Sequence, residues 1–147
     1  MGAQGTRLQS SWHGPFALTR DGIKENVKES PGVYRIPAFD AHGRPVSICR
    51  ANGVDAHGIL HIGQSVGLRG RILAFLLAAQ GGSAAHHAGN EFFQWEFGQR
   101  FPVEHFRFDY ILARSSEYAK KLERELHEAY RLRYLDRPPL DGTSGQE

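Results

Sequence analysis

The sequence has little of what marks secreted, disulfide-linked or membrane proteins. Cys49 is the only cysteine among 147 residues, which excludes an internal disulfide and a cysteine-based zinc site. No hydrophobic run approaches the length that crosses a membrane. The segment 1–11 is polar and contains glycine, where a secretory signal needs an apolar stretch. We therefore expect a soluble cytoplasmic protein with no membrane partner.

A large excess of charge of one sign is also absent. The 18 Lys and Arg residues exceed the 16 Asp and Glu residues by a formal net charge of +2. This mild basicity suits a polyanion, but most proteins of similar charge bind none. The hydrophobic fraction of 40% is typical of a folded domain. The length predicts one domain over residues 12–141, between a flexible N-terminal tail (1–11) and a C-terminal tail (142–147).

Hydrophobic periodicity and turn residues predict an α+β fold. Strands are expected near 33–36, 46–50, 59–62 and 106–113, and helices near 20–28, 68–79 and 115–134. Thr19 is the expected N-cap of the first helix. The segment 81–89 is interpreted as a loop, and 91–97 stays open between helix and strand. Its aromatic residues are expected in the core rather than on a base-stacking surface: Phe92, Phe93, Trp95 and Phe97.

The tetrapeptide Asp-Ala-His-Gly occurs twice, at 40–43 and at 55–58. Paired Asp and His residues could indicate a metal site. No further ligand converges on either copy by spacing, so we interpret both as loop turns with glycine at a positive φ.

A polar turn, 64–67, joins the strand that ends at Gly63 to the next helix. Such a junction can present backbone N–H groups to a phosphate, although a plain tight turn is commoner. Arg71 shares a helix face with apolar residues, so it either pairs with a structural carboxylate or points into a cleft that binds an anion. Arg69 is expected to be exposed, and Gly70 indicates a close backbone approach.

The last helix carries one carboxylate at the edge of its apolar stripe. Glu123 lies at this edge, whereas Glu125 and Glu128 lie on the opposite side. A half-buried carboxylate suits a metal ligand or a catalytic acid. The alternative is a boundary salt bridge, to Lys120 or His127.

Taken in order, these motifs resemble the GIY-YIG nuclease superfamily. Gly32-Val33-Tyr34 matches the first tripeptide, and His61-Ile62-Gly63 matches the second. The remaining matches are the turn and helix entry (Gln64-Ser65, Leu68), the arginine eight residues after Gly63 (Arg71), the helix-borne glutamate with its leucines (Leu122-Glu123, Leu126) and a proline-rich C-terminal motif (Pro138-Pro139-Leu140). The resemblance runs from about Gly14 to Asp141.

Two residues depart from the family pattern. His61 stands where the family has its second tyrosine, and Asp141 stands where it has a terminal asparagine. The loop 35–60 between the two tripeptides is also long.

The resemblance implies a small three-stranded antiparallel sheet flanked by helices, with an insert between the first and second motif strands and the site on one face. It implies a divalent-metal-dependent endonuclease that hydrolyses phosphodiester bonds in DNA. Tyr34 and His61 would activate or position water, and Arg71 would stabilise the phosphorane. Glu123 would bind Mg²⁺ or Mn²⁺.

His61 is a plausible replacement base, because an imidazole pKa near 6.5 suits neutral pH better than a phenol pKa near 10. Asp141 either brings a second carboxylate near the metal or lies in a frayed tail. His86 and His87 resemble a histidine that borders the site in some relatives, but loop histidines are more often merely exposed. The expected substrate contacts are Gly63, Gln64, Ser65, His87 and Asp141.

Nucleic acid would be held through its phosphates. The basic residues of the last helix are Lys120, Lys121, Arg124, Arg131 and Arg133. The alternative function is a catalytically impaired nucleic-acid-binding domain of the same fold, which the changes at His61 and Asp141 favour. Retention of Tyr34, Arg71 and Glu123 favours activity. Both a monomer and a homodimer stay open.

Overall fold

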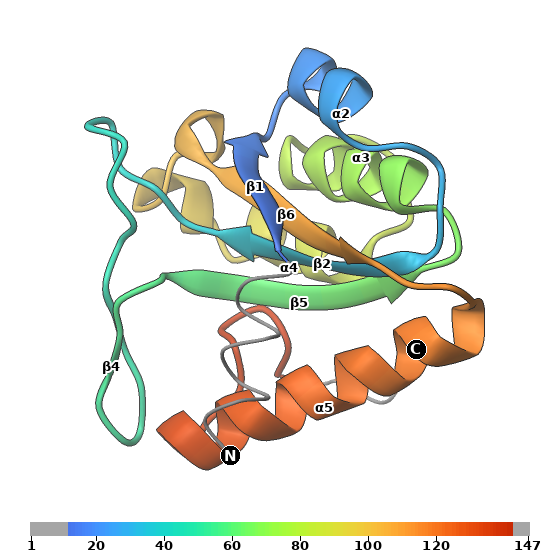
Figure 1. Ribbon diagram of the computed structural model, residues 1–147. Coiled ribbons are helices and arrows are strands. Elements are labelled where there is room, and N and C mark those ends of the chain that lie inside the picture. Colours follow the sequence, from blue (N-terminus) through green and yellow to red (C-terminus); the bar gives the residue numbers. More distant parts are fainter. Residues whose placement is uncertain (1–11, 143–147) are drawn as a thin grey trace.

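The computed structural model describes residues 12–142, and within them the fold is α+β (Figure 1). A four-stranded antiparallel sheet has the order β1-β6-β2-β5. Its strands are β1 (His13–Ala17), β2 (Gly32–Pro37), β5 (Ile59–Ser65) and β6 (Arg107–Leu112). The expected sheet of three strands was wrong by one. β1 was missed because Gly14-Pro15 interrupts any strand-like alternation, and its pairing with β6 is irregular between His13 and Phe16.

Helices cover both faces of this sheet. α2 (Arg20–Asn26), α3 (Leu68–Ala79) and α4 (His87–Gln94) lie on one side, and α5 (Ser116–Tyr134) lies on the other (Figure 1). The pleat of β2 divides the core accordingly: Tyr34 packs in the cluster with α3, and Val33 packs in the cluster with α5. Short 3₁₀ turns lie at Phe97–Gln99 and Val103–His105.

The insert between β2 and β5 contains a separate two-stranded ribbon. β3 (Ile48–Cys49) pairs with β4 (Val54–Asp55) and not with the main sheet. Both Asp-Ala-His-Gly copies form the expected turns. The Asp40 carboxylate accepts from the His42 and Arg44 amides, and the Asp55 carboxylate accepts from the His57 and Ile59 amides. The glycines that close these turns have φ of +75° and +66°, as expected.

The helix boundaries agree with the predictions to within two residues, since α2 ends at Asn26 and α5 begins at Ser116. Thr19 caps α2, Ser115 caps α5, and α3 spans the expected 68–79. The expected loop 81–89 is wrong at its end, because α4 begins at His87. Core packing is confirmed for Phe92, which is buried. It is wrong for Phe93 and Trp95, which are 55% and 71% exposed.

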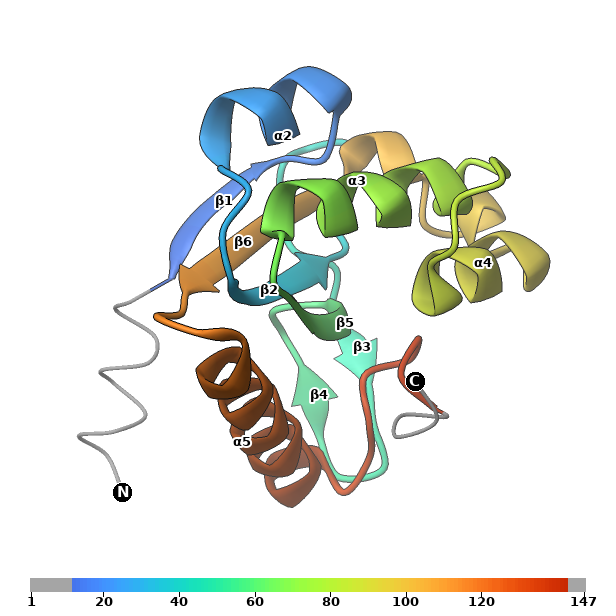
Figure 2. The same ribbon diagram turned by 90° about the vertical axis from the view of Figure 1, so that its right-hand side faces the viewer.

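β5 is an edge strand whose outer side is partly covered by the C-terminal segment. The chain turns back from the end of α5 toward the sheet (Figure 2). The Leu140 amide donates to the Leu60 carbonyl at 2.9 Å, and the Ile62 amide donates to Asp141 Oδ2 at 2.9 Å. The frayed-tail interpretation of Asp141 is therefore wrong. The predicted tail 1–11 and residues 143–147 of the C-terminal tail lie outside the described residues.

Over residues 12–142, none of the helices combines the length and the apolar character that a membrane span requires.

Candidate functional site

An open groove runs along β5 between the two helical layers. Tyr34 from β2, His61 from β5, Arg71 from α3 and Glu123 from α5 all line this groove. The expected substrate contacts Gly63, Gln64, Ser65, His87 and Asp141 line it as well. The residues predicted from four separate motifs thus share one surface.

The site was expected to lie on one face of the sheet, but it does not. Tyr34 packs with α3 and α4, whereas α5, which carries Glu123, packs on the opposite face. The groove reaches both helices because β5 is the last strand of the sheet. The arrangement therefore wraps around a sheet edge, with Arg71 approaching from one side and Glu123 from the other.

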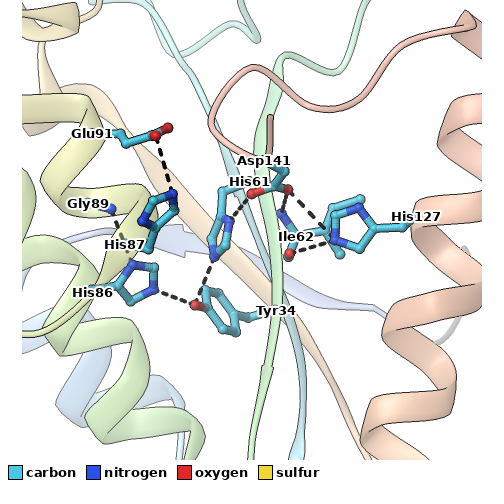
Figure 3. A network of polar contacts seen from close by, with 9 residues as sticks. All are labelled: Tyr34, His61, Ile62, His86, His87, Gly89, Glu91, His127 and Asp141. Atoms are coloured by element: carbon cyan, nitrogen blue, oxygen red, sulfur yellow. Dashed lines mark hydrogen bonds and ion pairs between the residues drawn. The ribbon is translucent and has the colours of Figure 1, made fainter. Parts of the chain in front are cut away.

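A buried hydrogen-bond cluster begins at two of the groove residues, Tyr34 and His61, and continues to His86 (Figure 3). The hydroxyl oxygen of Tyr34 lies 2.9 Å from His61 Nε2 and 2.6 Å from His86 Nε2. The three side chains belong to residues that are only 1%, 5% and 1% exposed, respectively. Gly63 stands opposite Tyr34 in the β2–β5 register. A Cβ at Gly63 would lie 2.7 Å from the Tyr34 hydroxyl, so the motif glycine makes room for this cluster.

Asp141 continues the cluster on the other side of His61. Its Oδ1 lies 2.5 Å from His61 Nδ1, while Oδ2 accepts from the Ile62 amide (Figure 3). His127 of α5 donates through Nε2 to the Ile62 carbonyl at 3.0 Å. Asp141 and His127 together hold both polar backbone groups of Ile62. A carboxylate at this position therefore contacts the imidazole of His61 directly.

His86 was interpreted as an exposed loop residue, and this was wrong. It is buried, it caps α4, and its Nδ1 accepts from the Gly89 amide at 3.2 Å. Burial, with smaller contributions from the neighbouring His61 and Arg71, lowers the pKa of His86 to about 2. His86 is therefore neutral at physiological pH. A local signal was hard to find, because histidine is not among the preferred N-cap residues.

This burial predicts an acid-sensitive fold. The folded-state pKa of His86 is depressed, so the unfolded chain binds a proton below about pH 6.5 that the folded chain does not. The contribution to stability is present above that pH and is lost progressively as the pH falls. Between pH 7.5 and pH 5 we expect the free energy of unfolding in urea to fall by about 2 kcal/mol from this group. His86→Gln should flatten the slope, and the exposed control His57→Gln should not. Equal slopes in all three proteins would contradict the assignment.

Arg71 and its helix neighbours differ in their roles. Arg71 lines the groove and donates through Nη1 to the Ala85 carbonyl at 3.1 Å, which favours the cleft interpretation over a structural ion pair. Arg69 was expected to be exposed, but it is half-buried and donates to the Val27 and Lys24 carbonyls. The close approach expected at Gly70 is confirmed. Its amide donates to the carboxylate of Glu29 at 3.0 Å.

The hydrogen bond from Gly70 to Glu29 bears on whether the turn 64–67 and the start of α3 can bind a phosphate. Glu29 takes an amide in the first turn of α3 that a phosphate at the helix N-terminus would need. The carboxylate of Glu29 thus already occupies the N-terminus of α3. Gln64 and Ser65 still line the groove, where they can contact a ligand. His87 is half-exposed at the groove and pairs with Glu91 at 3.2 Å.

Glu123 is half-buried, and Glu125 and Glu128 are exposed, as the helical periodicity predicts. Across residues 12–142 there is no group of three or more His, Cys, Asp or Glu side chains placed to hold a metal ion. Mg²⁺ often takes one or two carboxylates and completes its shell with water and substrate phosphate. A single groove carboxylate such as Glu123 would suit this mode, whereas a closed protein cage would need more protein ligands.

The groove carries more cations than carboxylates. Its basic residues are Arg50, Arg71, Lys120, Arg124, Arg131 and Arg137, and its acidic residues are Glu123, Glu128, Asp136 and Asp141. Three of the five basic residues predicted on α5 are among them. Lys121 instead lies 4.0 Å from Glu125, and the guanidinium of Arg133 lies over the Tyr134 ring.

In comparisons with family models, curated proteins and solved structures, the chain has no match. The resemblance to GIY-YIG nucleases therefore stays a prediction from the motifs, and the function has to be argued from the chemistry of the groove.

Proposed function

We propose that this protein is a divalent-metal-dependent endonuclease that hydrolyses phosphodiester bonds in DNA. The observation that carries the proposal is the shared groove, which Tyr34, His61, Arg71 and Glu123 line from four different elements. The excess of cations along the same groove supports a polyanionic substrate.

Each residue has a distinct part in this reaction. Arg71 is the guanidinium that would contact the scissile phosphate and stabilise its developing charge. Glu123 would hold Mg²⁺ or Mn²⁺, and the bound ion would act as a Lewis acid on the phosphate. Tyr34 and His61 would activate the attacking water. The basic residues Lys120, Arg124 and Arg131 would hold the flanking phosphates along α5.

Cleavage of supercoiled plasmid, single-stranded DNA and branched DNA tests the proposal, with Mg²⁺, Mn²⁺ or EDTA. We expect metal-dependent cleavage that Glu123→Gln lowers by about 100-fold or more. Glu125→Gln is the matched control, because Glu125 lies two residues away on the exposed side of α5 and should keep wild-type activity. Cleavage that survives Glu123→Gln would contradict the assigned metal ligand.

Two observations favour a second function, nucleic-acid binding without cleavage. Tyr34 and His61 are buried, and Arg71 and Glu123 come from helices on opposite faces of the sheet. A nucleic-acid-binding domain without chemistry would need the basic groove and not a reactive centre. DNA binding without cleavage of any substrate would favour this alternative and end the nuclease proposal.

A further inference from the structure

The hydrogen-bond partners define where the protons of the buried cluster lie, beginning at His86. Nδ1 of His86 accepts the Gly89 amide, so it carries a lone pair. His86 is neutral, so its single ring proton is on Nε2 and is donated to the Tyr34 oxygen. The Tyr34 hydroxyl proton is then directed to its other neighbour, Nε2 of His61.

The opposite end of the cluster agrees with this direction. A carboxylate only accepts hydrogen bonds, so Asp141 Oδ1 receives the proton on His61 Nδ1. Nε2 of a neutral His61 is then an acceptor and faces the Tyr34 hydroxyl. Asp141 itself is fixed because its second oxygen accepts the Ile62 amide of the edge strand.

We propose that Asp141 is a positioning residue, which holds His61 in the tautomer whose Nε2 receives the hydroxyl proton of Tyr34. This inference rests on the proposed nuclease function and assigns Asp141 to neither metal nor substrate. His86 completes the arrangement by donating a hydrogen bond to the Tyr34 oxygen, which directs the hydroxyl proton toward His61.

The proton balance of the step is complete. Water gives a proton to the Tyr34 oxygen as the bond between the water oxygen and phosphorus forms, and the Tyr34 proton moves to His61 Nε2. The bond between phosphorus and the leaving oxygen breaks, and that oxygen takes a proton from solvent. The imidazolium of His61 faces the Asp141 carboxylate until it loses its proton to solvent.

The amide of Ile62 makes Asp141→Asn a decisive substitution. The asparagine must turn its oxygen toward that amide, because two donors cannot face each other. Its NH₂ group then points at His61 Nδ1 and requires a lone pair there. The ring proton is displaced to Nε2, where it opposes transfer from Tyr34.

The experiment combines ¹⁵N NMR of the histidine rings with steady-state cleavage. In the wild type we expect His61 protonated on Nδ1 and His86 on Nε2. Asp141→Asn should move the His61 proton to Nε2, lower kcat about 100-fold and leave KM within about threefold. The exposed carboxylate Asp21, in the first turn of α2, supplies the control Asp21→Asn, which should change none of these readouts.

The outcomes separate this inference from the proposed function. Absence of wild-type cleavage sinks the nuclease function. Wild-type cleavage that persists at full rate in a folded Asp141→Asn sinks only the positioning role. If Asp141→Asn does not fold, the wild-type spectrum still decides, because a His61 proton on Nε2 overturns the proposal.

Discussion

Arg71→Ala is expected to lower kcat for phosphodiester cleavage by about 10³-fold while the protein stays folded. An arginine aimed at a phosphoryl group stabilises charge that is largest in the transition state, so its removal lowers kcat more than it raises KM. Arg71 is half-buried, and its guanidinium donates to the Ala85 carbonyl, a contact that water can replace. Kinetics over a range of substrate concentrations measure the effect.

Arg69→Ala is the matched control for this prediction. Arg69 is on the same helix, but it donates to the last carbonyls of α2 and does not line the groove. We expect it to lose about 1 kcal/mol of stability and no activity. Arg71→Lys should recover only part of the rate, since an ammonium lacks the planar pair of donors. Equal rates for Arg71→Ala and the wild type would remove Arg71 from the mechanism.

Tyr34→Phe is expected to cause the second large loss, again about 10³-fold in kcat. The hydroxyl is hydrogen-bonded to both His61 and His86, and both rings are buried. Without it, a donor and an acceptor lose their partner inside the protein, which costs about 1–3 kcal/mol for each unsatisfied group. Thermal unfolding measures the stability term separately from the rate.

Tyr110→Phe distinguishes a reactive hydroxyl from a structural one. Tyr110 is directly opposite Tyr34 in the β2–β6 register, and its hydroxyl donates to the Asn26 carbonyl at 2.6 Å. Its loss should lower the melting temperature and leave cleavage unchanged. A parallel loss of activity in both variants would mean that Tyr34 acts through stability alone.

The sequence predicted those features that depend on neighbouring residues. The bounds of α3 follow from local hydrophobicity, and the edge position of Glu123 on α5 follows from helical periodicity. The turn at Asp55 follows from side-chain hydrogen bonds to the next few amides. These interactions join residues that are close in the sequence, so the order of residue types is enough to predict them.

The features that sequence patterns missed depend on distant contacts. His86 reads as a loop residue until α4 folds against α3 and buries it beside Tyr34, 52 positions away in the chain. Asp141 was matched to the family's terminal position, but its role stayed open in the sequence because its contact with His61 spans 80 positions. The spread of the site around the β5 edge depends on the strand order, which residue types do not encode.

In the proposed mechanism, the segment that covers β5 has two effects: it orients His61 and it protects the sheet edge from self-association. An uncovered edge strand presents unpaired amides and carbonyls that can extend a sheet into a neighbouring molecule. Leu140 and Asp141 occupy such groups on Leu60 and Ile62, and Asp141 at the same time orients His61. If this segment detached from β5, His61 would lose the carboxylate that the proposed mechanism requires, and the same motion would expose unpaired backbone groups on Leu60 and Ile62.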